Sequence, residues 1–373
     1  MNFRVASGMI TGGMDQGSAL YDIVLLEENA GAVKVVLDKS FTARFVRERP
    51  RVTLETLSGF EVRSVVVPSG FGTRLKLVRE MTPRDFLEIS LKRQDYMTSS
   101  LANVIAVFKQ ANIDTYVIPA VKQLPTVPRE RRFNRIDLGT SDKVCAAALG
   151  IYTQSTRSGA AVSDTEFILA ELGSAFNAFV AVSSGEIVNG IGGTLSSMGM
   201  SSRGAFDGEI AALLGTVDKR RAYEGGVLYL FANGETVPEE FFLHAFNGNE
   251  RARVLMEAYT SGILGDIGSM MASSGIKPKE VFISGRVSRV KQYVAYISEK
   301  IEHTFGLKVS FLETFGALSK EGAIGAALIA NGIAGGRFST IVDTLRLREA
   351  TGSVFDDIYL DETTLRWIQE TKV

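Results

Sequence analysis

Short turns that combine glycine with hydroxyl and carboxyl side chains are the part of this sequence best suited to phosphate chemistry. One such turn, Asp15-Gln16-Gly17-Ser18, lies near the N-terminus. A carboxylate at a turn can hold Mg²⁺ through water, and Gly17 lets backbone N–H groups approach a phosphate beside the Ser18 hydroxyl. We therefore predict that Asp15 is a catalytic residue and metal ligand. The alternative is a simple Asx turn between two strands.

The segment Phe167–Glu209 contains a second turn of this kind. Two apolar runs, Phe167–Ala170 and Ala178–Val182, read as strands on either side of Glu171-Leu172-Gly173-Ser174. A tight turn of small residues between two strands can hold phosphate with backbone N–H groups and hydroxyls. The alternative is an ordinary hairpin, because short glycine motifs match by chance.

A glycine-rich loop and a polar stretch follow this hairpin. The loop, Asn189–Thr194, offers Gly192, Gly193 and Thr194 as further phosphate ligands, and the polar stretch carries Arg203 and Asp207. The guanidinium of Arg203 could bind phosphate or carboxylate oxygens through two parallel hydrogen bonds. The alternatives are a glycine-rich surface loop and an Arg203–Asp207 surface ion pair.

A third candidate anion site precedes an alanine-rich helix. Gly139-Thr140-Ser141 opens the predicted helix Val144–Tyr152. Free N–H groups, the positive end of a helix dipole and two hydroxyls suit an anion. The basic cluster Arg129–Arg135 adds attraction for anions, or is an ordinary solvated face.

The elements that must position these turns follow from apolar periodicity. Before residue 160, β-branched and alternating runs predict strands at Tyr21–Glu27, Val33–Asp38, Val52–Leu57, Val62–Val67 and Tyr116–Ala120. Helical spacing predicts helices at Pro83–Gln94 and Ser99–Gln110. Several adjacent strands early in the chain indicate an antiparallel start to a mixed sheet.

The second half alternates helices with strands. We predict helices at Phe206–Leu214, Glu250–Ser273, Arg286–Phe305, Ser319–Ala327 and, weakly, Glu362–Thr371, and strands at Val281–Gly285 and Lys308–Leu312. The Val281–Gly285 strand ends at a turn, so Gly285 and Arg286 stand where a ligand can bind. Small residues in Ser319–Ala327 allow close packing against a neighbouring helix or a bound nucleotide.

Composition excludes several classes of protein. The chain has 373 residues, of which 45% are hydrophobic and 22% charged, and its net charge is −1. This balance gives no drive toward nucleic acid or a membrane surface. One cysteine, Cys145, rules out an internal disulfide, and two histidines make a Cys/His zinc site improbable. The first residues lack the apolar core of a signal peptide, so we expect a cytoplasmic protein.

The order of these motifs resembles that of the acetate and sugar kinase, Hsp70 and actin superfamily. Within it, RRFNRIDLGTSDK, MSSRGAFDGE and VFISGRVSRV are similar to segments of acetate kinases. As a whole, the chain from Gly13 to about Gly336 most resembles an archaeal family of predicted butyrate kinases.

The resemblance implies an α/β fold of two ribonuclease-H-like, actin-like ATPase domains, with mixed sheets flanked by helices and a nucleotide cleft between them. The domains would span residues 1–160 and 161–336, with residues 337–373 as a tail that packs back on the first. ATP and Mg²⁺ would be the cofactors and a small carboxylate the substrate. Whether the protein forms a homodimer is left open.

The resemblance also implies roles for individual residues. Arg203 would neutralise the transferring phosphoryl group or the carboxylate, and Asp207 would position that group or the metal. The nucleotide-binding residues would be Gly17, Ser18, Gly139, Thr140, Glu171, Gly173, Ser174, Gly192, Gly193, Thr194, Gly285, Arg286 and Glu321, of which the last three border the adenosine.

Three positions depart from the acyl-kinase pattern. Leu138 and Asp142 replace two histidines of the acetate-kinase segment, and Glu171 stands where acetate and butyrate kinases have a histidine and sugar kinases an aspartate. Phosphoryl transfer depends mainly on positioning and charge neutralisation, so it does not require these histidines. Their absence equally fits an actin- or Hsp70-like ATPase switch or scaffold without acyl-kinase activity.

Overall fold

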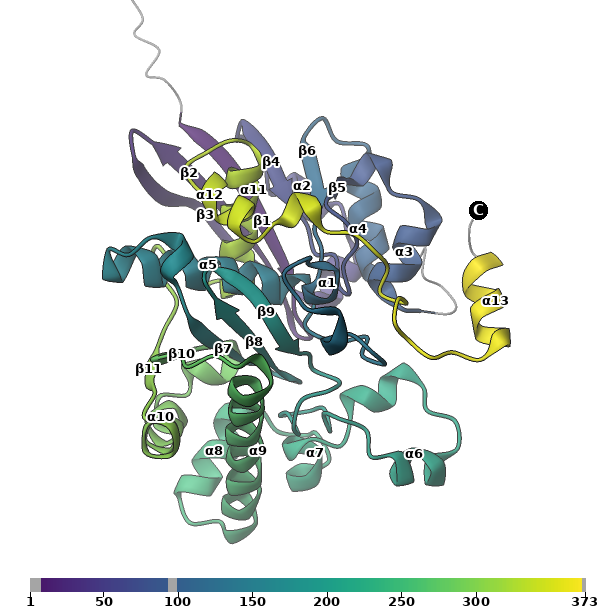
Figure 1. Cartoon of the computed structure of the whole chain (residues 1–373), viewed down its shortest axis with the longest axis vertical. Helices are drawn as coiled ribbons and strands as arrows, with labels where there is room; N and C mark the ends of the chain where they lie inside the picture. Colours follow the sequence, from purple (N-terminus) through teal and green to yellow (C-terminus); the bar gives the residue numbers. More distant parts are fainter. Residues whose placement is uncertain (1–7, 93–98, 371–373) are drawn as a thin grey trace, which may run out of the picture.

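The fold contains two mixed β-sheets, one from each half of the chain (Figure 1). The computed structural model describes residues 8–92 and 99–370. In these residues the first sheet has the order β3-β2-β1-β4-β6-β5. Its strands are β1 Met9–Gln16, β2 Leu20–Asn29, β3 Ala32–Thr42, β4 Val62–Val66, β5 Lys76–Leu77 and β6 Asp114–Val117. The antiparallel pairs β1–β2 and β2–β3 confirm the predicted antiparallel start.

Among the described residues as far as β6, the α-helices are α1 Ala43–Glu48, α2 Val52–Glu55, α3 Pro83–Ser90 and α4 Ser100–Lys109. The predicted strand Val52–Leu57 is wrong, because Val52–Glu55 forms α2. The Thr53 hydroxyl donates to the Pro50 carbonyl at 2.7 Å. This local bond favours a turn over a strand, although the segment contains β-branched residues. The predicted helix Pro83–Gln94 ends at Ser90, since Leu91 is left-handed, and part of its predicted remainder lies outside the described residues.

The second sheet has the order β11-β10-β7-β8-β9. Its strands are β7 Phe167–Leu172, β8 Asn177–Ser183, β9 Glu186–Ile191, β10 Glu280–Ser284 and β11 Lys308–Ser310. The first predicted strand therefore continues through Glu171 and Leu172, and β9 takes up Asn189–Ile191 from the predicted glycine-rich loop. The helices of this half are α6 Gly208–Leu214, α7 Val227–Ala232, α8 Pro238–Phe246, α9 Glu250–Ser274 and α10 Lys291–Phe305.

The two sheets repeat one topology. In the first, β1, β2 and β3 are antiparallel neighbours, and β4 and then β6 continue in parallel from β1. In the second, β7, β8 and β9 are antiparallel neighbours, and β10 and then β11 continue in parallel from β7. β1 and β7 are therefore equivalent strands, and the turns that follow them occupy equivalent places.

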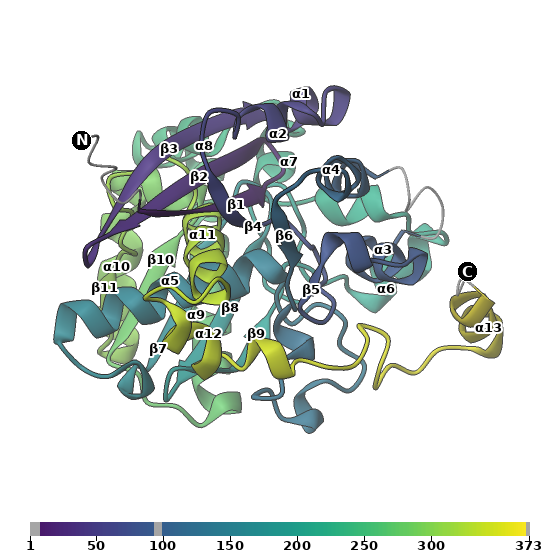
Figure 2. The same cartoon turned by 90° about the horizontal axis from the view of Figure 1, so that it is seen from above.

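Two helices lie between the sheets: α5 Ser141–Ser158 and α11 Glu321–Ile333 (Figures 1 and 2). They share one hydrophobic cluster with residues of both sheets, including Val24 and Val66 of the first and Leu169 and Val180 of the second. Small residues make the helices fit, because a Cβ on Gly325 would lie 1.9 Å from the Cys145 carbonyl oxygen. The small-residue helix thus meets a neighbouring helix, one of its two predicted partners.

Residues 337–370 lie along the first half of the chain (Figure 2). They include α12 Ser339–Thr344 and α13 Glu362–Glu370. Lys122 donates to the Val354 carbonyl at 2.8 Å, and Ser353 donates to Glu88 at 2.7 Å. Arg84 donates to the Ile368 carbonyl. These bonds attach the chain after residue 337 to elements that precede residue 160.

The longest described helix, α9, has 25 residues and buries one face, which includes Tyr259, Ile263 and Ile267. Asn249 caps it by accepting a hydrogen bond from the Ala252 N–H, and Gly275 ends it in a left-handed conformation. Within residues 8–92 and 99–370, no helix has both the length and the hydropathy needed to cross a membrane.

The contact between α5 and α11 yields a stability prediction. Gly325→Ala should lower the free energy of unfolding by about 1–3 kcal/mol, because the new methyl group collides with backbone atoms that cannot move independently. Gly265→Ala in α9 is the matched control. Nothing lies within 4 Å of its added Cβ, so it should stabilise the helix by up to about 1 kcal/mol. Denaturant unfolding measures both, and equal midpoints for the two variants would contradict the packing.

Candidate functional site

Two turns that begin with Gly-Ser-Ala and are closed by the same hydrogen bond follow β1 and β7. The first is Gly17-Ser18-Ala19-Leu20 and the second is Gly173-Ser174-Ala175-Phe176. In each, the glycine N–H donates to the carbonyl of the fourth residue, at 2.8 Å in the first turn and 2.9 Å in the second. In both turns, the N–H groups of the serine and the alanine have no hydrogen-bond partner anywhere in the described part of the chain. Both turns therefore present two adjacent N–H donors to a ligand.

A carboxylate stands two residues before each turn. Asp15 is buried on β1, and Glu171 is partly buried on β7. Because β1 and β7 are equivalent strands, the two acids hold equivalent places in the two halves of the protein. Both turns are predicted in the sequence, but their equivalence is not. The repeated letters Gly-Ser-Ala after an acidic residue were the signal that would have shown it.

Lys320 accompanies Asp15. This lysine is the N-cap residue of α11, and its Nζ lies 3.6 Å from Oδ2 of Asp15 and 3.9 Å from Oδ2 of Asp22 on β2. Burial raises the pKa of Asp15, although Lys320 opposes that rise. The same two carboxylates hold the pKa of Lys320 above its ordinary value, against the effect of burial.

Lys143 accompanies Glu171. Its Nζ donates to Oε1 of Glu171 at 2.8 Å and to the carboxylate of Asp142. Burial raises the pKa of Glu171 to about 7, although Lys143 opposes it. Burial also acts to raise the pKa of Asp142, but Lys143 outweighs it and holds that pKa below its usual value. Sequence reasoning assigned no role to Lys143 or Lys320, because no local pattern distinguishes them from surface lysines.

The predicted sites at Gly139–Thr140 and Gly192–Thr194 are joined by Asp137. The Asp137 carboxylate accepts from the Thr194 N–H and hydroxyl, both at 3.0 Å, and from the Gly139 N–H at 3.3 Å. Its carbonyl accepts from the Gly192 N–H at 2.9 Å. The Thr140 hydroxyl donates to Asp142. These donors therefore already have acceptors within the protein, on Asp137 and Asp142.

The three residues predicted to border adenosine lie at the ends of β10 and α11. Gly285 has φ 84° and donates to Glu321 at 3.4 Å. Burial raises the pKa of Glu321. The Arg286 guanidinium binds both carboxylate oxygens of Glu239, at 2.9 and 3.0 Å. The structure therefore brings Gly285 and Glu321 together, while Arg286 already has a bidentate partner.

Arg203 follows residues that are bonded to the second turn. The N–H groups of Ser201 and Ser202 donate to the Ala175 carbonyl at 3.2 and 3.0 Å, and the Ser201 hydroxyl donates to the Ser174 carbonyl at 3.1 Å. The Arg203 guanidinium lies over the Phe206 ring, 4.6 Å from its centroid, and its Nε is buried without a hydrogen-bond partner. The guanidinium itself lies near Phe206 and Gly225, and a guanidinium nitrogen without a partner is suited to an anion.

Asp207 has a different position from Arg203. It is exposed and is the N-cap residue of α6, where its carboxylate accepts from the N–H groups of Glu209 and Ile210. In the described part of the chain, no ion pair joins Asp207 to Arg203. An acidic residue before a helical run is a common N-cap, so this capping role was visible in the sequence.

Asp15 is the carboxylate that the sequence predicts as a metal ligand. Among the residues described, no three His, Cys, Asp or Glu side chains are placed to hold a metal ion together. Oδ2 of Asp22 is buried and lacks a hydrogen-bond partner beside Asp15. This arrangement fits a hydrated cation that binds mainly to phosphate, as Mg²⁺ does, and does not fit an all-protein cage.

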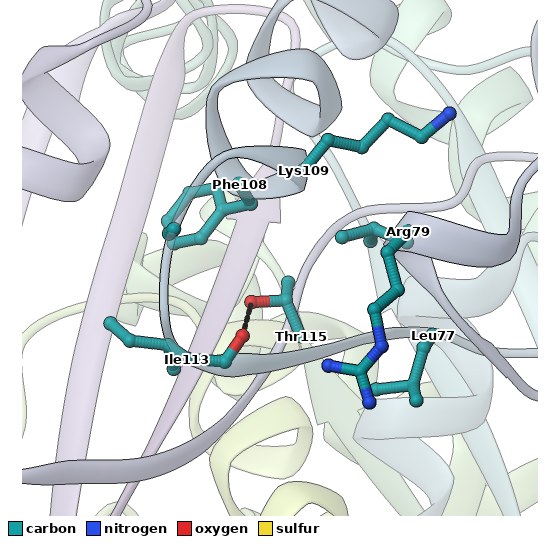
Figure 3. A pocket seen from close by; sticks show the side chains of 8 residues that line it. Leu77, Arg79, Phe108, Lys109, Ile113 and Thr115 are labelled. Carbon is teal, nitrogen blue, oxygen red and sulfur yellow. Dashed lines mark hydrogen bonds between the residues drawn. The ribbon is translucent and has the colours of Figure 1, made fainter.

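Two hollows lie away from these turns. One, between β5, β6 and α4, has a volume of about 20 Å³ and is lined by Leu77, Arg79, Phe108 and Thr115 (Figure 3). It has room for about one water molecule. The other, about 460 Å³, is lined by Leu230, Arg251, Val254 and Leu255 on α7 and α9. Neither includes a residue predicted for the site.

The fold, with two mixed sheets of one topology and helices α5 and α11 between them, is the fold of solved acetate kinase structures. An acetate kinase from Porphyromonas gingivalis matches with TM-score 0.60 at 14% identity, over 86% of this chain and 98% of that chain. An acetate kinase from Entamoeba histolytica matches with TM-score 0.55 at 12% identity, over 82% and 95%. A ROK family glucokinase from Streptomyces griseus, in complex with glucose and AMPPNP, gives TM-score 0.49 at 14% identity, over 86% and 99%.

The chain belongs to the family described as "Protein of unknown function (DUF1464)", whose model matches residues 13–360. No curated protein sequence matches it significantly. The acetate kinase structures confirm the predicted fold class, and the family match spans both sheets.

The buried pair at β7 yields a prediction on pH. Glu171 titrates near pH 7 in the folded protein but near its ordinary value of 4.5 in the unfolded chain. Between these values the folded state binds a proton that the unfolded chain has released, so this group makes stability fall as pH rises. Glu171→Gln lacks this loss, and its stability relative to wild type should rise from about pH 4.5 to pH 7.

Urea unfolding at several pH values measures this difference in unfolding free energy. Glu299→Gln, at an exposed position on α10, is the control and should follow the wild-type curve. Parallel curves for Glu171→Gln and wild type would show that Glu171 titrates normally.

Proposed function

We propose that this protein is an ATP-dependent phosphotransferase that acts on a small carboxylate, in the manner of a butyrate or acetate kinase. One observation carries the proposal: two equivalent Gly-Ser-Ala turns, each with free N–H groups, an acidic residue and a nearby lysine, occur in the fold that acetate kinases share. Backbone donors and fixed cations are what the stabilisation of a polyphosphate requires.

In this proposal the two turns divide the phosphates between them. The N–H groups after Gly17 and Gly173, with the Ser18 and Ser174 hydroxyls, bind the β- and γ-phosphates. Asp15 would hold a hydrated Mg²⁺, which would supply positive charge beside the phosphates. A carboxylate oxygen of the acceptor attacks the γ-phosphorus, the bond to the ADP oxygen breaks, and an acyl phosphate and ADP result.

The remaining predicted residues take supporting roles in the proposal. Gly285 and Glu321 border the adenosine, and Arg286 closes that side while bound to Glu239. The segments Gly139–Thr140 and Gly192–Thr194, held together by Asp137, form a wall beside the second turn, where Gly193 lies against Phe176. Arg203 reaches the transferring phosphoryl group or the acceptor carboxylate from the segment bonded to the second turn. Asp207 positions that transferring group by fixing the start of α6.

We also propose that the domains follow the two sheets, with residues 1–160 and 161–336 as the halves and residues 337–373 as a tail on the first. The hydrogen bonds from Lys122 and Arg84 to the tail support its assignment to the first domain. Each half then contributes one acid and one Gly-Ser-Ala turn, so that transfer depends on both.

A second candidate function is slow ATP hydrolysis by a nucleotide-dependent switch. The observation that favours it is the position of Glu171, two residues before the second turn, where burial raises the pKa of its carboxylate to about 7. A carboxylate of that pKa is suited to accept a proton from water, whereas a carboxylate acceptor carries no proton to remove. Phosphate release that a protein partner stimulates, with no small acceptor present, distinguishes this function.

The main test is chemical trapping of the product. Incubation with ATP, Mg²⁺, hydroxylamine and C2–C5 carboxylates should yield a hydroxamate with at least one acid. Asp15→Asn should lower the rate by about 10²-fold or more, because the metal loses its anionic partner. Clear ATP binding without hydroxamate from any acid would overturn the acyl-kinase assignment.

Arg203 gives a second test. Arg203→Lys should keep the fold and ATP affinity but lower turnover by a factor on the order of 10³, because lysine cannot reproduce two parallel hydrogen bonds to the transition state. Arg253→Lys, on the exposed face of α9, is the control and should retain full activity. Steady-state kinetics and thermal melting decide, and full activity of Arg203→Lys would remove Arg203 from the mechanism.

A further inference from the structure

Lys320 holds a sheltered ammonium group without a hydrogen-bond acceptor. Its side chain is 22% exposed, and its nearest carboxylate oxygens, on Asp15 and Asp22, lie at 3.6 and 3.9 Å. Both distances exceed that of a hydrogen bond. Within residues 8–92 and 99–370, no other acceptor is bonded to Nζ of Lys320, so its three N–H donors are available.

The ammonium lies directly beside the first turn. A Cβ built on Gly17 would come within 1.8 Å of Nζ of Lys320. The next two residues of that turn, Ser18 and Ala19, carry the N–H groups that have no partner in the described chain. The Lys320 ammonium and the two free N–H groups therefore lie close together at the first turn.

The position of Lys320 is set by the first sheet. Asp38 on β3 accepts from the Leu318 N–H at 2.6 Å and from the Ser319 hydroxyl. These bonds fix the two residues before Lys320, and α11 begins immediately after it. The lysine backbone is thus anchored on both sides, so the ammonium does not range as a surface lysine would.

The second lysine of the site is not equivalent in its bonding. Nζ of Lys143 already donates to Glu171 and Asp142. It balances those carboxylates and has less capacity for a new anion. Lys320 differs, because its carboxylates attract it without accepting its protons.

We infer that Lys320 binds a phosphate oxygen of the nucleotide at the first turn, together with the N–H groups of Ser18 and Ala19. The inference rests on the proposed function. Without this ammonium, Asp15 and Asp22 would present two negative charges to an approaching polyphosphate, which would repel it. With it, the turn offers charge-assisted hydrogen bonds to phosphate. Lys320 is in this way a phosphate-binding residue for the transfer reaction.

Calorimetry with ATP and with adenosine tests the inference without requiring turnover. Lys320→Gln should weaken ATP binding by a factor on the order of 10 to 100, the usual effect of losing a charged hydrogen bond. Its affinity for adenosine should stay at the wild-type value. Lys308→Gln, at an exposed position on β11, is the matched control and should bind both ligands as wild type does.

Removal of Lys320 leaves Asp15 and Asp22 without their cation, so unfolding must be considered. Where Lys320→Gln alone does not fold, the double variant Asp22→Asn/Lys320→Gln removes one negative charge with the positive one and should show the same selective loss for ATP. Wild-type ATP affinity in either folded variant, or no ATP binding by the wild-type protein, overturns the inference. Absence of acyl transfer alongside the selective ATP loss would overturn the proposed acceptor and leave Lys320 in its role.

Discussion

The close contact of α5 and α11 is the constraint on which the site depends. The backbones approach so nearly that Gly325 has no room for a Cβ beside Cys145, and the shared cluster joins both sheets through these helices. The helix starts carry Asp142 and Lys143 on α5, and Lys320 and Glu321 on α11. Fixing the helices against each other therefore sets each lysine beside the acid that it neutralises, on β1 or on β7.

The burial of the site's acidic side chains determines their charge balance. Two carboxylates, Asp15 and Glu171, lose hydration, which raises their pKa values, and each has one ammonium group close by. Buried charges are tolerated only when they are paired, and a polyanion can enter only where backbone donors and cations outweigh the carboxylates. The paired Gly-Ser-Ala turns supply those donors twice, once in each half.

Local sequence predicted the parts of this arrangement that depend on local rules. Apolar runs located β7, β8 and β10, and the small residues of α11 predicted close packing. The prediction of a strand from β-branched residues failed at Val52, where a turn after Pro50 outweighed their propensity. Pairs such as Lys143–Glu171 and Lys320–Asp15 could not be predicted, because the fold and not the spacing brings them together. Glu239 as the partner of Arg286 was hidden for the same reason.

The central claim is that the two Gly-Ser-Ala turns bind the phosphates of one nucleotide together. A crystal structure of the protein with Mg²⁺ and a non-hydrolysable ATP analogue tests it most directly. The account predicts phosphate oxygens within hydrogen-bond distance of the N–H groups of Ser18 and Ala19 in one turn, and of Ser174 and Ala175 in the other. Phosphates bound to one turn alone, or at another place on the protein, would contradict it.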